Sequence, residues 1–173
     1  MRLVPALAAA LALPALPAAA MDISSPDVKP NAPMAPAQIY PRCGGQNVSP
    51  GLAWTAPPAG TASLVLTVID VDAKPSFWSH WIVVGLPLGT TSLPRGDAAL
   101  PAGAHAVTAN FGDSAYDGPC PPAGSGVHHY QISIWAMPST AVSIGDNAPA
   151  NEVLSMLMRT SLAHATLVGT AQR

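Results

Sequence analysis

The sequence predicts a mainly β domain, and three observations support this fold class. Residues 63–70 and 80–86 are apolar runs of strand length that contain many β-branched side chains. Residues 128–135 form a third run, in which polar and apolar side chains alternate. Turn-forming residues separate the runs, since the chain contains 20 Pro and 14 Gly. Because the first two runs are apolar on both faces, we expect other elements to cover both sides of the sheet.

The first 20 residues are typical of a secretory signal peptide. Arg2 gives a positive start, an Ala/Leu-rich stretch interrupted by prolines follows, and three alanines ending at Ala20 offer a cleavage site. A retained membrane anchor is the alternative, but a spanning helix needs ~20 continuous apolar residues. Removing Arg2 changes the formal net charge from -2 to -3. We therefore expect a periplasmic or secreted protein without stable membrane insertion.

The rest of the chain is predicted to form one domain. Residues 21–42 contain five prolines and little periodicity, which indicates an extended N-terminal arm. Residues 43–173 are predicted to form a single domain without internal repeats.

The remaining elements follow from local patterns. Residues 88–104 are predicted to form a long loop, and His105 to Phe111 a short edge strand. Residues 112–126 are dense in turn formers and predict a semi-rigid loop. Cap residues and a proline precede apolar residues at helical spacing, which predicts a helix from about residue 150 to Ala163. Residues 165–170 are predicted to be a final strand.

The charge pattern excludes some classes of partner. Only 9% of the residues are charged, and no basic stripe of the kind that binds nucleic acid is present in the sequence. Attraction to anionic membranes is equally unsupported. We therefore expect neither a nucleic acid nor a membrane surface as a partner.

Two cysteines, Cys43 and Cys120, occur in the chain. In an exported protein such a pair is more often a disulfide than two free thiols, so we predict a Cys43–Cys120 bond. A partly buried free Cys120 lining a pocket is the competing interpretation. The chain contains no Cys-x-x-Cys motif and no distinctive metal-ligand spacing, so we predict no cofactor and no metal site.

Two acids, Asp70 and Asp72, end the first strand run. If the backbone stays extended, both side chains project from one face. Neighbouring buried carboxylates repel each other, so they need donors or a cation nearby, and His80 and His128 are the candidates. The alternative is that both acids only cap a turn.

The alternation of side chains along residues 128–135 predicts which of them point into the core. Ile132 and Ile134 occupy the apolar positions, which puts His128 and Tyr130 on the same inward face and His129 outward. An inward histidine is commonly a hydrogen-bonded core residue. Here it is expected to converge with the two acids and His80.

Several sequence blocks, taken in order, resemble the phosphatidylethanolamine-binding protein family and especially its bacterial Raf-kinase-inhibitor-like members. The blocks are Asn47-Val48-Ser49-Pro50, Asp70-Val71-Asp72-Ala73, Trp78-Ser79-His80-Trp81, Asn110-Phe111-Gly112, Tyr116-Asp117-Gly118-Pro119-Cys120-Pro121-Pro122 and His128-His129-Tyr130. Each block alone is weak, and their order and spacing make the resemblance specific.

This resemblance implies a β-sandwich with a few peripheral helices and an anion-accepting pocket at one end of the sheet. The pocket residues it implies are Asp70, Trp78, His80, Gly118, Pro119, His128 and Tyr130, with Asp72 as a neighbouring support. Such pockets accept phosphate-like groups, including the phosphoryl group of phosphorylethanolamine. A carboxylate beside a histidine raises the imidazole pKa, so an imidazolium would supply charge. This chain departs from the family by placing Lys74 in the loop after the acids.

The expected function is therefore binding of a small anionic, phosphate-type ligand by an exported protein. The family also implies a role as inhibitor or modulator of another protein, although an export signal disfavours a cytoplasmic kinase as the partner. The alternative is an enzyme that uses the Asp/His/Tyr cluster for general acid/base chemistry. The sequence shows no Gly-x-Ser-x-Gly elbow and no obvious activated nucleophile. A secreted β domain without a working pocket is the third possibility.

Overall fold

Two mainly antiparallel sheets, one α-helix and one short 3-10 helix make up the regular structure of the described residues. The computed structural model describes residues 20–96 and 99–173, so the predicted signal peptide up to residue 19 lies outside the described residues. The six-stranded sheet has the order β2-β9-β8-β4-β5-β7 and the three-stranded sheet the order β1-β3-β6. Within the large sheet only the short β2–β9 pair is parallel.

The elements have the following bounds in chain order. They are β1 (Ile23–Ser24), β2 (Ala32–Pro33), the 3-10 helix η1 (Pro41–Cys43), β3 (Leu52–Trp54), β4 (Ser63–Asp70), β5 (Trp78–Leu86), β6 (Ser92–Leu93), β7 (His105–Ala106), β8 (His128–Met137), α1 (Ala150–Thr160) and β9 (Ala163–Ala171).

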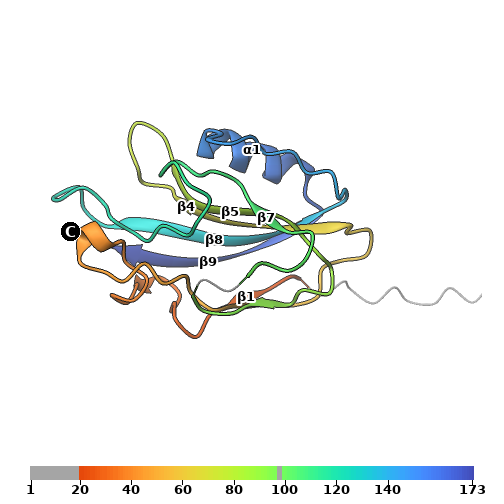
Figure 1. The fold of residues 1–173 in the computed structure, drawn as a ribbon, viewed down its shortest axis with the longest axis horizontal. Helices are drawn as coiled ribbons and strands as arrows, with labels where there is room; N and C mark the ends of the chain where they lie inside the picture. Colours follow the sequence, from red (N-terminus) through yellow and green to blue (C-terminus); the bar gives the residue numbers. More distant parts are fainter. Residues whose placement is uncertain (1–19, 97–98) are drawn as a thin grey trace, which may run out of the picture.

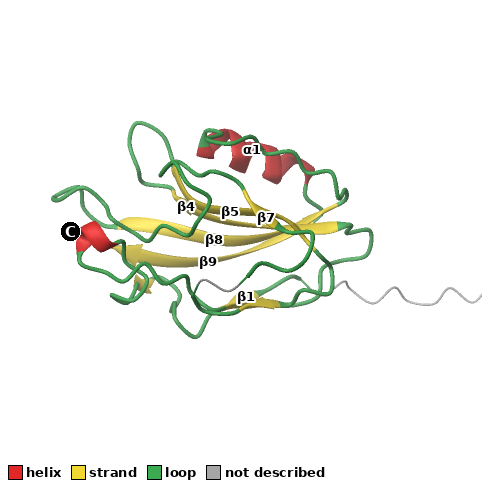
Figure 2. Cartoon of the chain, in the orientation of Figure 1, coloured by secondary structure: helices red, strands yellow, loops and turns green. Residues whose placement is uncertain are grey.

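The large sheet lies between α1 on one face and the small sheet on the other (Figure 1). Strands dominate the secondary structure, with α1 as the main helix near the C-terminus (Figure 2). The predicted mainly β sandwich with peripheral helices is confirmed.

Strand β4 is buried along its whole length. Leu64, Leu66 and Val68 pack in the core between the two sheets, whereas Val65 packs in a second core under α1. The expectation that both faces of this strand are covered is therefore confirmed, and the alternation of its side chains divides the two cores. Asp70, at the end of β4, continues the face of Leu66 and Val68.

Some predicted bounds were wrong. The edge strand expected over 105–111 contains only His105–Ala106, and α1 ends at Thr160 because the chain turns into β9 by Ala163. Residues 21–42 contain β1 and β2 and bury four apolar side chains in the core between the sheets, namely Met21, Ile23, Val28 and Met34. Nonlocal pairing with β3 and β9 fixes these short strands, and local periodicity does not reveal such pairing.

Candidate ligand site

The site begins where three neighbouring strands end together. Asp70 of β4 lies opposite Trp78 of β5 and opposite Tyr130 of β8. Residues that face each other across a ladder point to the same side of the sheet, and so does His128, two positions from Tyr130. His128 and Tyr130 are buried and His129 is exposed, so the predicted parity of this strand is confirmed.

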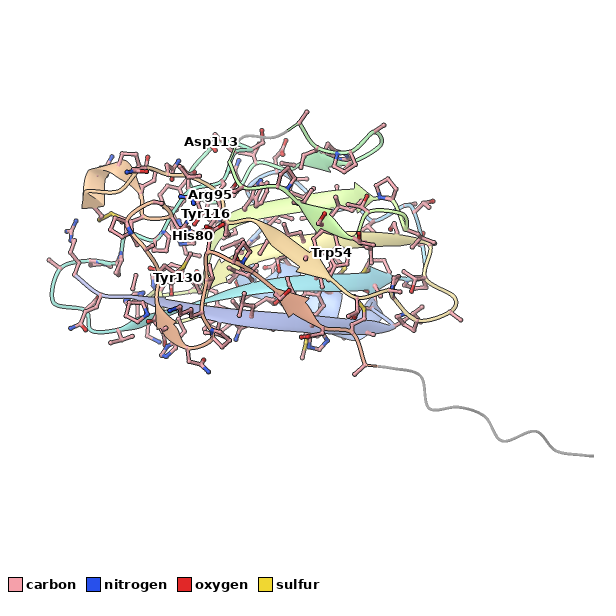
Figure 3. The ribbon with its side chains drawn as sticks, turned by 90° about the horizontal axis from the view of Figure 1, so that it is seen from below. Trp54, His80, Arg95, Asp113, Tyr116 and Tyr130 are labelled. Carbon is pink, nitrogen blue, oxygen red and sulfur yellow. A yellow bond between two sulfur atoms is a disulfide. The ribbon has the colours of Figure 1, made fainter. Side chains whose placement is uncertain are left out.

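A β-bulge brings His80 to the same side. Val68 pairs with Trp81 and Ile69 pairs with Ser79, which leaves His80 as the extra residue of β5. In a regular strand His80 would share a face with Ile82, which packs under α1. Instead its ring centroid lies 5.1 Å from that of Tyr130. Figure 3 shows both rings at the same end of the molecule, away from Trp54.

These side chains line a cavity of about 440 Å³. Its lining consists of Asp70, Asp72, Ala73, Lys74, Trp78, His80, Phe111, Cys120, Pro121, Pro122, Ser125, His128 and Tyr130. The structure thus brings together six of the eight residues that the sequence singled out. The other two, Gly118 and Pro119, do not line this cavity. The aromatic and proline side chains make much of the wall apolar.

The Asp70 carboxylate accepts three hydrogen bonds beside the cavity. Its Oδ2 accepts a bond from His128 Nδ1 at 2.7 Å, and both side chains are almost fully buried. Its Oδ1 accepts the backbone N–H groups of Asp72 and Ala73 at 2.9 and 3.1 Å. Asp70 therefore both caps a turn and pairs with a histidine. The histidine that pairs with it is His128, whereas His80 binds elsewhere.

Asp72 has left the strand and does not face Asp70 as a second buried acid. Its Oδ2 accepts a bond from His129 Nδ1 at 2.7 Å, and both side chains are more than 40% exposed. The hydrogen bond from His129 lowers the pKa of Asp72. Asp72 lines the cavity, whereas His129 does not, and exposed pairs of this kind contribute little to stability.

His80 donates from Nδ1 to the carbonyl oxygen of Asp117 at 2.7 Å, because a carbonyl can only accept. Burial lowers the pKa of His80 to about 4, against which that carbonyl and Asp70 act more weakly. The ring is therefore neutral at pH 7, with Nε2 as an acceptor. His80 therefore supplies no positive charge at pH 7, because desolvation of the buried ring outweighs the nearby carboxylate.

Stability should accordingly depend on pH through His80. Between pH 4 and 6.5 the unfolded chain binds a proton that the folded state does not, so this contribution is full above pH 6.5 and is lost on acidification. We expect wild type to lose about 2 kcal/mol more than His80→Asn between pH 7 and 4.5. Urea unfolding at both pH values measures this difference.

Asp117 changes the pH dependence of stability in the opposite direction, because burial and then the charge of Asp113 raise its pKa to about 6. It is present in both proteins, so the comparison still isolates His80. Equal pH dependence of the two proteins would contradict a buried, neutral His80.

Tyr130 supplies a free donor. Its side chain is fully buried, and its hydroxyl has no hydrogen-bond partner in the described part of the chain. Burial, and then the charge of Asp70, raises the pKa of this hydroxyl. It therefore keeps its proton and remains available to a ligand.

The loop that contains Gly118 is held from behind by Asn47. Asn47 Oδ1 accepts the Gly118 N–H at 2.7 Å, and its Nδ2 donates to the carbonyl oxygen of Tyr116 at 3.0 Å. This contact sets the Asp117 carbonyl that receives His80. Gly118 itself packs on the backbone of residues 38–40, so it supports the wall rather than lining it.

Gly118→Ala should therefore destabilise the fold. A Cβ there would meet the Gln38 carbonyl oxygen and would lie 2.6 Å from the Tyr40 nitrogen, and backbone cannot move aside as a side chain can. We expect a loss of about 1–3 kcal/mol in thermal or urea unfolding. Gly145→Ala is the matched control, because a Cβ at Gly145 meets nothing within 4 Å. Equal effects at both positions would contradict this close packing.

Sequence reasoning missed Ser125 and Asn47. Ser125 Oγ lies 2.9 Å from His128 Nε2 and forms part of the cavity wall. Ser125 lies in a turn-rich loop without periodicity, and only the three-dimensional path of that loop shows its partner. Asn47 stood in a quoted block, but the sequence does not show that its side chain holds the distant loop of Gly118.

Over residues 20–96 and 99–173, no three side chains of His, Cys, Asp or Glu gather closely enough to hold a metal ion. In the same part of the chain, no helix has the length and apolar character needed to span a bilayer.

Known proteins share this fold and sequence pattern. LppC of Mycobacterium tuberculosis, named as a candidate lipoprotein, is 39% identical over 157 residues, covering 91% of this chain and 75% of that protein. YbcL of Escherichia coli is 34% identical over 158 residues, covering 87% and 86%. The crystal structure of YbcL, described as a new member of the mammalian PEBP family, superimposes with a TM-score of 0.81 over 90% of this chain and 99% of its own, at 32% identity.

The family profile described as phosphatidylethanolamine-binding protein matches residues 24–172, which is nearly all of the chain beyond the predicted signal peptide. The match includes the ends of β4, β5 and β8 that form the cavity. The chain therefore belongs to the phosphatidylethanolamine-binding protein family.

Proposed function

We propose that the cavity binds a small anionic ligand of the phosphate type. The observation that carries this proposal is the Tyr130 hydroxyl, a fully buried donor at the cavity without a protein partner. A buried donor left without an acceptor is costly, and an oxyanion would satisfy it. The Lys74 ammonium at the rim adds positive charge, whereas the oxygens of Asp70 are already occupied.

The hydrogen bonds also indicate the form of the anion. Beside the Tyr130 donor, the cavity presents His80 Nε2 as an acceptor. An anion that keeps one proton satisfies both groups, and a phosphate monoester does so below its second pKa of about 6. A sulfate ester has no such proton. We therefore expect methyl phosphate to bind at pH 5 at least about 10-fold more tightly than methyl sulfate.

Calorimetry with Tyr130→Phe tests the binding function. Removing a hydrogen bond to a charged group costs ~1.5–3 kcal/mol, so the affinity for methyl phosphate should fall by about 10- to 100-fold. Stability should not fall, because the hydroxyl has no protein partner.

Tyr116→Phe is the matched control. Its hydroxyl donates to the Gln38 carbonyl oxygen at 3.0 Å and does not line the cavity. This variant should lose about 1 kcal/mol of stability and keep its affinity for methyl phosphate. Unchanged affinity in Tyr130→Phe, or no binding in wild type, would contradict the proposal.

The proposal includes export to the periplasm or the exterior. It is supported by the signal-like residues 1–20 and by the disulfide, which persists mainly in oxidising compartments. Intact mass of the protein recovered from a periplasmic extract should correspond to a chain that lacks about 20 residues. Recovery of the full-length chain would contradict it. Inhibition of a partner protein, which the family implies, would then concern an extracytoplasmic enzyme.

A further inference from the structure

Three side chains form a continuous hydrogen-bonded chain along the cavity. Ser125 Oγ lies 2.9 Å from His128 Nε2, and His128 Nδ1 lies 2.7 Å from Asp70 Oδ2. This is the order of contacts in a serine–histidine–aspartate triad, which is recognised by geometry and roles rather than by sequence position. Asp70 is buried and held by two backbone N–H groups, as the orienting acid of a triad requires.

The backbone presents Ser125 to the cavity. It lies between Gly124 and Gly126, whose φ angles of 77° and 91° are accessible mainly to glycine. A Cβ at either glycine would meet nothing within 4 Å, so the space around the serine is open. Ser125 is exposed and lines the cavity, whereas its two partners are buried.

The hydroxyl has one other acceptor nearby. Ser125 Oγ lies 2.7 Å from the Pro122 carbonyl oxygen, to which a hydroxyl can also donate. That carbonyl already accepts the Ser125 N–H at 3.1 Å. The Pro122 carbonyl oxygen therefore keeps one hydrogen bond when the Ser125 hydroxyl proton points toward His128 Nε2. In that orientation His128 can accept the proton and activate Ser125 Oγ.

We propose that Ser125 is a nucleophile and that this cavity hydrolyses small, neutral carboxylic esters. Ser125 Oγ attacks the ester carbonyl carbon while its proton moves to His128 Nε2. The C–O bond to the alcohol then breaks, and the alcohol leaves with that proton. Water attacks the acyl-serine with the same histidine as base, which releases the carboxylic acid and restores the hydroxyl. Asp70 remains a carboxylate and holds the imidazole by Nδ1–H throughout.

The rest of the cavity suits this substrate class. The free Tyr130 hydroxyl can donate to the oxyanion that forms during attack. Trp78, Phe111 and Pro121 offer apolar walls to the acyl or alcohol group.

Covalent labelling and turnover test the proposal together. A fluorophosphonate probe should form one adduct on wild type, with loss of fluoride, and peptide mapping should place it on Ser125. Hydrolysis of p-nitrophenyl acetate should fall by about 100-fold or more in Ser125→Ala and in His128→Gln. His129→Gln is the control, because its partner Asp72 is exposed and Ser125 does not contact it.

The Ser125→Ala variant separates ester hydrolysis from anion binding. Ser125→Ala keeps the Tyr130 hydroxyl and should still bind methyl phosphate while it loses the adduct and the turnover. If wild type forms no adduct and Ser125→Ala hydrolyses the ester as fast as wild type, the nucleophile is overturned. Methyl phosphate binding by that same protein would then leave the anion-binding function standing.

Discussion

Asp70→Ala is expected to lower the free energy of unfolding by about 3–5 kcal/mol, because it breaks a buried pair and leaves His128 without its partner. The substitution also removes the acceptor of the N–H groups of Asp72 and Ala73, so the loop at the cavity rim loses its anchor. Thermal unfolding should shift downward by roughly 10 °C for a domain of this size. Calorimetry or urea unfolding at pH 7 measures the loss.

Asp72→Ala is the control that the chain itself provides. Its contact with His129 Nδ1 has the same 2.7 Å length, but both side chains are more than 40% exposed. Water and salt screen such a pair, so we expect a loss of at most about 1 kcal/mol, and less at high salt. Should Asp70→Ala fail to fold, Asp70→Asn keeps an acceptor for the turn and should lose less. Similar losses from Asp70→Ala and Asp72→Ala would show that burial does not set the strength of these pairs.

Periodicity predicted the long elements of the fold well. The bounds of β4 were predicted from its β-branched residues, and its apolar faces correctly required cover on both sides. The two-residue strands β1, β2 and β6 were not predicted, because they exist only through pairing with distant strands. Residues 107–111 contain strand-like side chains, yet they meet β5 only through single backbone hydrogen bonds, from Val107 N to the Ile82 carbonyl oxygen and from Asn110 N to the Ser79 carbonyl oxygen, and no ladder continues past Ala106.

The site was predicted less completely, for reasons visible in particular residues. Parity placed His128 and Tyr130 correctly, because β8 is regular at that end. Parity would have placed His80 on the other face, since a bulge cannot be seen in the sequence. The neutral state of His80 follows from its burial, which sequence does not give. The contact of Ser125 with His128, three residues later, depends on the conformation of the turn between them, which periodicity does not give.

Removing the Cys43–Cys120 disulfide is expected to cost about 4 kcal/mol. The bond, predicted from the sequence and present in the structure, closes a segment of 77 residues. In the chain-entropy model the stabilisation comes from limiting the unfolded ensemble, and it grows slowly with loop length. Urea unfolding of a Cys43→Ser/Cys120→Ser double variant against wild type measures it.

Reduction supplies the control for this prediction. Dithiothreitol should lower the unfolding midpoint of wild type to that of the double variant and leave the variant unchanged. Ligand affinity should fall as well, because the disulfide ties η1 to the cavity wall that contains Cys120, Pro121 and Ser125. The hydrogen bond from Tyr40 N to the Pro119 carbonyl oxygen, at 3.1 Å, survives reduction and should keep that wall partly in place. A large loss of stability with unchanged affinity would mean that this bond, rather than the disulfide, positions the wall.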